Sequence, residues 1–211
     1  MKNAITLCGT NRSEAYVQKF YTAGQKLIFS SSERLNAEDA YNYLDLFGVY
    51  VYRGHANAGF LGLHTLNNVT TGYIMAHTDM MNISNAWYVN CFADNSLAQA
   101  RCVVYLGCKT GTDYINSNGT YNLVDETYKK GAHFVLGATE IMFSSYNDEW
   151  LKLFLENIQD GLCIKDAIEQ ANLSLGSVSV ERYDDNGSPY YVSLDAFPCY
   201  YAGDTKQYLN Y

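Results

Sequence analysis

Two residues of types that carry out nucleophilic catalysis, His55 and Cys108, each follow a short apolar run that ends in glycine. A cysteine thiolate attacks carbonyl carbon atoms, and a neighbouring imidazole orients the thiol or protonates the departing amine. Gly54 and Gly107 stand directly before the two residues and Gly111 follows Cys108, so a substrate backbone has room to approach. The pair predicts nucleophilic chemistry on a carbonyl group, provided that the fold brings the two side chains together.

The elements that must position this pair are two strands. Residues 48–55 form a β-rich apolar run that ends at His55, and residues 100–108 form a continuous buried run that ends at Cys108. Such continuous apolar runs are typical of parallel strands covered on both faces. Because chemistry in open α/β sheets gathers at the carboxyl ends of the strands, both residues are expected at the same edge if the strands are neighbours.

The remaining sequence alternates between strand and helix patterns. Further strands are expected at residues 4–8 and 132–138, with small strands and loops between 60 and 90 and a loop over 109–122. Helices are expected at 13–25, at 36–46 with Asn36 as N-cap, and at 121–130, 146–159 and 164–175. A hairpin with an Asn186-Gly187 turn is expected over 178–194. This alternation predicts an α/β fold, with a mostly parallel central sheet and helices on both faces, in a single domain over residues 1–211.

Composition narrows the function classes. The chain is 48% hydrophobic and 17% charged, with a net charge of -8. Nucleic-acid binding needs clustered cations, and the only adjacent pair is Lys129-Lys130, so we expect no nucleic-acid partner. No run of 18 apolar residues is present, and the N-terminus lacks the apolar stretch of a signal peptide. We therefore expect no membrane segment and a cytoplasmic location, or a domain excised from a larger or secreted protein.

Metal and cofactor chemistry have little support in the sequence. The six cysteines are irregularly spaced without a C-x-x-C pair, which disfavours a zinc or thioredoxin-like site. The intervals between His55, His64, His77 and His133 match no ligand template either. No strand is followed by a glycine-rich phosphate-binding motif, which disfavours a doubly wound nucleotide- or flavin-binding protein. We expect no metal and no cofactor.

Several segments resemble caspase-like (clan CD) cysteine peptidases, in the same order along the chain. Residues 52–59 (YRGHANAG) resemble their strand-end GHG segment, and residues 103–111 (VVYLGCKTG) resemble their nucleophile strand, especially in bacterial clostripain- and gingipain-like enzymes and CHAT domains. Residues 130–137 (KGAHFVLG) are similar to a later strand of those bacterial members, as are the helix pair at 150–171 and Ala202-Gly203-Asp204. Caspases carry their histidine about 50 residues before the cysteine, an interval close to the one here.

The resemblance implies a three-layer caspase-like fold and a cysteine endopeptidase with His55 and Cys108 as the catalytic residues. In the family, the backbone N–H after the histidine helps to form the oxyanion hole. Here the backbone N–H groups of Ala56 and Cys108 are the matching donors, although Ala56 stands where the family usually has glycine. Alanine keeps the N–H, so the hole survives unless that position needs a positive φ.

The resemblance also implies where a peptide or protein substrate binds. The residue two positions before the cysteine lines the primary pocket of several relatives, and here it is Leu106, followed by Gly107. The loop after the next strand lines the same pocket and holds Glu140, which is suited to a basic residue at the cleavage site. The alternative for Glu140 is a solvated loop acid. The alternative for the whole chain is a catalytically silent caspase-like interaction module.

Overall fold

The computed structural model describes residues 3–8, 26–31, 37–46, 48–64, 70–141, 144–184, 186–195 and 197–209. The helix predicted over residues 13–25 and the N-cap Asn36 lie outside these ranges. Within the described ranges, no helix has both the length and the apolar character needed to cross a membrane.

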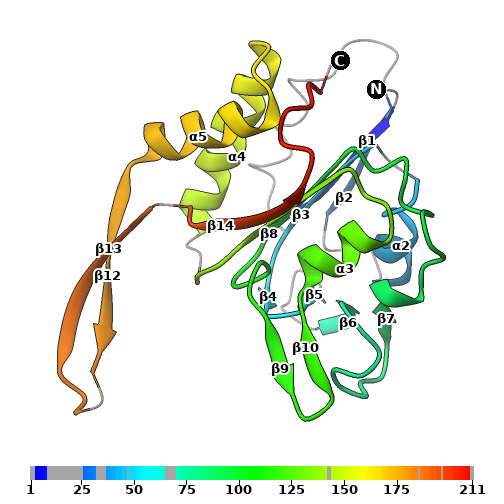
Figure 1. The fold of residues 1–211 in the computed structure, drawn as a ribbon, viewed down its shortest axis with the longest axis horizontal. Helices are drawn as coiled ribbons and strands as arrows, with labels where there is room; N and C mark the ends of the chain where they lie inside the picture. Colours follow the sequence, from blue (N-terminus) through cyan, green and yellow to red (C-terminus); the bar gives the residue numbers. More distant parts are fainter. Residues whose placement is uncertain are drawn as a thin grey trace.

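A six-stranded sheet forms the centre of the molecule (Figure 1). In spatial order its strands are β14 (Cys199–Gly203), β11 (Phe134–Ala138), β8 (Cys102–Leu106), β3 (Val49–Arg53), β1 (Asn3–Cys8) and β2 (Lys26–Ser31). Neighbouring strands are parallel, except that β14 runs antiparallel to β11. The four predicted strands are confirmed, whereas β2 and β14, which form the two edges, were not predicted.

Helices cover both faces of this sheet. They are α2 (Ala37–Asn42), α3 (Leu123–Lys129), α4 (Ser144–Gln159) and α5 (Ile164–Leu175). On β8, Val103 and Tyr105 pack into a core with α2 and α3, while Val104 and Leu106 pack into a second core with α4 and α5. Because every β8 residue is buried, a continuously apolar strand is what this position requires. The predicted α/β fold class, a mostly parallel sheet between two helical layers, is confirmed.

Helix ends follow from local chemistry. The Asn122 side chain accepts the Val124 N–H and caps α3. α2 is shorter than the helix predicted over 36–46, because the Leu44 and Leu46 N–H groups donate only three residues back, which tightens the chain into turns. This tightening ends the helix before β3 begins.

Short sheets flank the central one. A four-stranded sheet contains β4 (Ala56–Asn57), β5 (Phe60–His64), β6 (Thr70–Met75) and β7 (Ala86–Tyr88), with a 3-10 turn at Val89–Cys91. The predicted loop at 109–122 instead contains a hairpin of β9 (Tyr114–Asn116) and β10 (Gly119–Tyr121). The Asn116 side chain accepts the N–H groups of Asn118 and Gly119, which closes its turn.

A long hairpin of β12 (Ser177–Tyr183) and β13 (Pro189–Asp195) projects from the body, as Figure 1 shows; we call residues 177–195 the arm. The predicted hairpin is confirmed, and its strands lie close to the predicted bounds. Residues 184–188 join the strands, and Gly187 has a φ of 78°, a left-handed conformation that glycine adopts readily in a turn. The Asp184 carboxylate accepts the N–H groups of Asn186 and Ser188, which stabilises the loop.

Candidate active site

The register of β3 and β8 brings their carboxyl ends together. Arg53 pairs with Leu106 at the end of the parallel ladder, and the Gly54 N–H donates to the Leu106 carbonyl oxygen at 3.3 Å. His55 and Cys108 each lie two residues beyond that pair, so they follow adjacent strand tips at one edge of the sheet. Since His55 is exposed and Cys108 is partly exposed, solvent reaches both residues.

Glu140 continues the same row beyond β11. Gly137 of β11 pairs with Tyr105 of β8, and Glu140 and Cys108 each lie three residues beyond that pair. The Lys109 N–H donates to the Glu140 carbonyl oxygen at 3.0 Å, which joins the two strand ends directly. Three consecutive strand tips therefore carry a histidine, a cysteine and a glutamate at one edge.

The turn after Cys108 is held firmly to β11. Lys109 has a φ of 56°, a left-handed conformation that turns the chain sharply. The fully buried Thr110 hydroxyl lies 2.8 Å from the Tyr105 carbonyl oxygen and accepts the Ala138 N–H at 3.0 Å. Because one side chain bridges β8 and β11 here, the backbone that carries the thiol is positioned by hydrogen bonds on both sides.

Gly107 lets the two candidate catalytic segments touch. A Cβ atom at this position would lie 2.5 Å from the Ala56 Cβ atom and 3.1 Å from the Gly54 carbonyl oxygen. The residue before Cys108 thus packs directly against the residues on either side of His55. Any side chain at position 107 would push the two strand tips apart.

Leu106 and Gly107 were predicted to line the substrate pocket. Leu106 has no exposed surface and packs in the core formed with α4 and α5, and Gly107 is also buried. Their contact with substrate stays a prediction.

Two hydrogen bonds to its carbonyl oxygen hold the backbone of His55 in place. Its carbonyl oxygen accepts the Gly62 N–H at 2.8 Å and lies 2.6 Å from the Tyr52 hydroxyl. Burial raises the pKa of Tyr52 well above its usual value; a backbone hydrogen bond with Gly62 partly lowers it, and electrostatic interaction with Cys108 raises it. The phenol therefore stays neutral, and its proton remains available for a hydrogen bond to these carbonyl groups.

The geometry at Ala56 bears on the oxyanion hole. Because the Gly62 N–H bonds to the His55 carbonyl, the next pair in the antiparallel ladder, Ala56 with Leu61, is of the non-hydrogen-bonded kind. In such a pair the N–H points away from the partner strand. Ala56 does not have a positive φ, so alanine fits here without strain. The Ala56 N–H is thus directed away from β5, as an oxyanion donor requires.

An ion pair connects the end of β3 to α4. The Arg53 guanidinium contacts the Asp148 carboxylate through two nitrogen atoms, at 2.7 and 3.1 Å. The side chains are only 7% and 15% exposed, and two-point contacts of this kind fix the orientation of both groups. Arg53 lies two residues before His55, so α4 helps to position the histidine segment.

Glu140 has an intramolecular partner. Its carboxylate lies 2.6 Å from the guanidinium of Arg182 on the arm, and the two side chains are 30% and 33% exposed. Glu140 is therefore a half-buried, paired acid. This contact lies directly beside the turn that carries Cys108, because the Glu140 carbonyl accepts the Lys109 N–H.

The other thiols whose side chains the structure describes differ from Cys108 in their surroundings. Burial raises the pKa of both Cys102 and Cys199 to about 12, so neither forms a thiolate near neutral pH. Cys163 is buried, and Cys91 is exposed at the end of the short 3-10 turn rather than at a strand tip of the central sheet. Across the described ranges, no group of three or more metal-binding side chains is arranged to hold an ion.

Sequence reasoning missed Tyr52, Thr110, Asp148 and Arg182 as parts of this site. Tyr52 and Thr110 stand within the motifs that we compared with the family, two or three residues from His55 and Cys108. Their closeness in sequence to the two candidate catalytic residues could have identified them as parts of the site. Asp148 and Arg182 lie far along the chain from the strands that they contact, so no local pattern connects them to the site.

Comparison with known proteins shows the fold. No protein-family model matches the chain, and no curated protein is similar in sequence. A crystal structure of the Saccharomyces cerevisiae separase–securin complex matches with a TM-score of 0.51 at 13% identity, over 81% of this chain and 10% of the matched chain. A second structure of that complex has a TM-score of 0.45 at 12% identity, over 75% and 9%.

The first of these matches and the sheet topology define a caspase-like α/β fold. The chain is similar in architecture to part of separase and spans about a tenth of the matched chain. The finer resemblance to bacterial clostripain-like, gingipain-like and CHAT-domain members stays a prediction.

Proposed function

We propose that this chain is a cysteine endopeptidase with Cys108 as nucleophile and His55 as its partner. The observation that carries the proposal is the register of β3 and β8, which aligns the two residues beyond adjacent strand tips. Solvent exposure of His55 and partial exposure of Cys108 support it, because a substrate must reach both. The caspase-like fold makes peptide hydrolysis the expected chemistry of a Cys-His pair at this edge.

In the proposed reaction, the Cys108 thiolate attacks the scissile carbonyl carbon, and the carbonyl oxygen becomes an oxyanion. The backbone N–H groups of Ala56 and Cys108 stabilise this oxyanion. His55 gives a proton to the departing amine as the C–N bond breaks, which leaves a thioester on Cys108. Water, deprotonated by His55, then attacks the thioester and releases the acid product together with the free thiol.

We further propose a preference for a basic residue at the cleavage site. Glu140 occupies the strand tip next to Cys108, and a carboxylate there is suited to pair with a lysine or arginine side chain of a peptide substrate. That Glu140 already holds the guanidinium of Arg182 supports this preference, because it demonstrates that the carboxylate accepts such a group.

A peptidyl electrophile that reacts with catalytic thiols tests the proposal. We expect stoichiometric labelling of Cys108, loss of labelling in Cys108→Ala and strong slowing in His55→Ala. Cys91→Ala controls for the exposed thiol and Cys102→Ala for the buried one, and both variants should label like the parent protein. Mass spectrometry of the digested adduct identifies the modified residue.

Hydrolysis of a diverse peptide library then tests turnover. A folded protein whose Cys108 resists every peptidyl electrophile, and which cleaves no peptide, would contradict the proposal and favour the catalytically silent interaction module.

A further inference from the structure

One face of the arm is less exposed than the other. Burial alternates along both of its strands: Val178 and Arg182 of β12 and Val192 and Leu194 of β13 are half-buried, whereas the described side chains between them are exposed. The cross-strand pairing of Val178 with Leu194 places these residues on one face of the ribbon. The two faces of the ribbon therefore differ in exposure, and Arg182 lies on the less exposed face.

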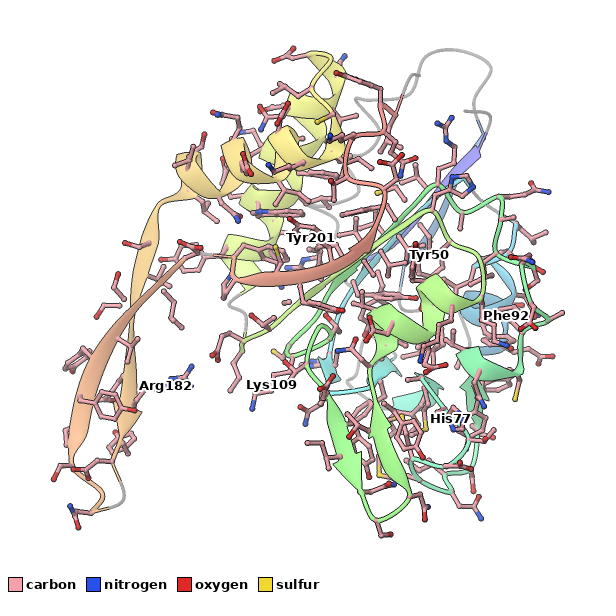
Figure 2. All side chains as sticks on the ribbon, viewed as in Figure 1. Tyr50, His77, Phe92, Lys109, Arg182 and Tyr201 are labelled. Atoms are coloured by element: carbon pink, nitrogen blue, oxygen red, sulfur yellow. The ribbon has the colours of Figure 1, made fainter. Side chains whose placement is uncertain are left out.

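Neither hydrophobic core includes a described residue of the arm. The ion pair of Arg182 with Glu140, at 2.6 Å, is therefore a specific connection between the arm and the row of strand tips. Figure 2 shows Arg182 extending from the arm toward the segment that carries Lys109. The guanidinium thus lies where a basic substrate side chain would have to bind if Glu140 receives it.

We propose that Arg182 is a specificity-determining residue that competes with the substrate: it occupies the Glu140 carboxylate, and a peptide with arginine or lysine at the cleavage site must displace it. This inference rests on the proposed function of Glu140. A half-exposed ion pair is weak, so the competitor can be displaced. Arg182 therefore lowers the affinity of the site for a peptide with a basic residue at the cleavage position. The affinity for a peptide with an uncharged residue there is unchanged.

The size of the effect follows from the strength of the pair. When a site is free for only a fraction of the time, the apparent association constant of its ligand equals the intrinsic constant multiplied by that fraction. A partly exposed pair of this type corresponds to a reduction of about fivefold. Arg182→Ala should remove this reduction, and Arg182→Lys should retain most of it because the charge remains.

Binding rather than catalysis provides the test. On a Cys108→Ala background, we would titrate two acetylated tripeptide amides that differ only in their last residue, arginine or norleucine, and follow binding by NMR. Arg182→Ala is expected to tighten binding of the arginine peptide about fivefold and to leave binding of the norleucine peptide unchanged. Lys165→Ala, which removes a cation from the exposed pair with Glu169 on α5, is the matched control and should change neither value.

Three results would overturn the inference: an unchanged dissociation constant for the arginine peptide in Arg182→Ala, equal tightening for both peptides, or no arginine-dependent binding in either variant. The proposed peptidase activity fails separately. If Arg182→Ala strengthens arginine binding while peptidyl electrophiles leave Cys108 unlabelled, the competition is real and the catalytic assignment is wrong.

Discussion

Gly107 lies at the point where the two candidate catalytic segments meet. The absence of a side chain lets the backbone before Cys108 contact Ala56 and the Gly54 carbonyl group. The two nearest atoms are the Ala56 Cβ atom and the Gly54 carbonyl oxygen, which cannot rotate away. The site therefore depends on the absence of a Cβ atom at position 107, because closely packed interiors transmit even small changes of volume.

Gly107→Ala should therefore impair the site more than the fold. Overpacking of this kind costs about 1–3 kcal/mol of stability. Displacement of one strand tip from the other should slow labelling of Cys108 by a peptidyl electrophile about tenfold or more, because reaction rates depend steeply on geometry. Urea denaturation and labelling rates, measured under conditions where the variant is folded, separate the two effects.

Gly72→Ala is the matched control. Its Cβ atom would lie 2.7 Å from both the Ala37 Cβ atom and the Asn85 carbonyl oxygen, away from the Gly107 contact. This variant should lose stability while its labelling rate stays near that of the parent protein. Equal slowing in both variants would argue against a special role of Gly107.

At the scale of elements, the site is held between β3, β8, β11 and α4. The Arg53–Asp148 pair connects α4 to the end of β3, just before His55. Both side chains are largely buried, so each needs the charge of the other to offset the loss of hydration. The helix is thereby fixed to the strand tip that carries the histidine.

Asp148→Ala should destabilise the protein by about 3 kcal/mol, because it removes the carboxylate from a buried guanidinium. The double variant Arg53→Met/Asp148→Leu should recover most of this loss, since replacement of a buried pair by apolar groups is often nearly neutral. Thermal or urea unfolding measures both. The Lys152–Glu149 pair on the same helix, whose side chains are 33% and 44% exposed, is the control, and Glu149→Ala should change stability by about 0.5 kcal/mol or less.

The arm is expected to contribute little to the stability of the body. Because neither core takes a described side chain from it, replacing residues 178–194 with a short Gly-Ser linker should leave the free energy of unfolding within about 1 kcal/mol of the parent value. Loss of cooperative unfolding in this variant would mean that the arm is part of the folding unit. Urea denaturation monitored by tryptophan fluorescence suits this test, since Trp150 lies in the core of the body.

At the scale of the whole molecule, the central sheet separates two cores, and both contain ionisable groups held neutral. Tyr50 and Tyr105 lie in the core with α2 and α3, and Cys102 lies in the core with α4 and α5. Burial raises the pKa of each of them, because the charged form cannot be hydrated in the interior. The protein therefore depends on these groups remaining protonated.

Stability should consequently fall at alkaline pH. Between about pH 9 and 12 the Cys102 thiol is protonated in the folded state and ionised in the unfolded state, so the unfolded state binds fewer protons. Stability is then fully present below about pH 9 and declines by about 1.4 kcal/mol per pH unit for each such group. Urea denaturation at pH 8, 9.5 and 10.5 measures the slope. Cys102→Ala removes one contributing group and should flatten it.

Much of the fold and part of the site can be predicted from local sequence. The run at residues 100–108 predicts β8 because a strand buried on both faces must be apolar throughout, and the helix at 164–175 is confirmed as α5. The edge strands β2 and β14 and the β9–β10 hairpin were missed. Edge strands and short hairpins lack the continuous apolar pattern of central strands, so their residues carry a weaker signal.

Apolar runs ending in glycine were enough to place His55 and Cys108 at strand ends, because strand formation and chain reversal depend on neighbouring residues. Long-range contacts alone decided that β3 and β8 are adjacent in register, that Asp148 of α4 pairs with Arg53, and that Arg182 of the arm contacts Glu140. These contacts join residues far apart along the chain, and their formation depends on how complete elements pack rather than on any local pattern.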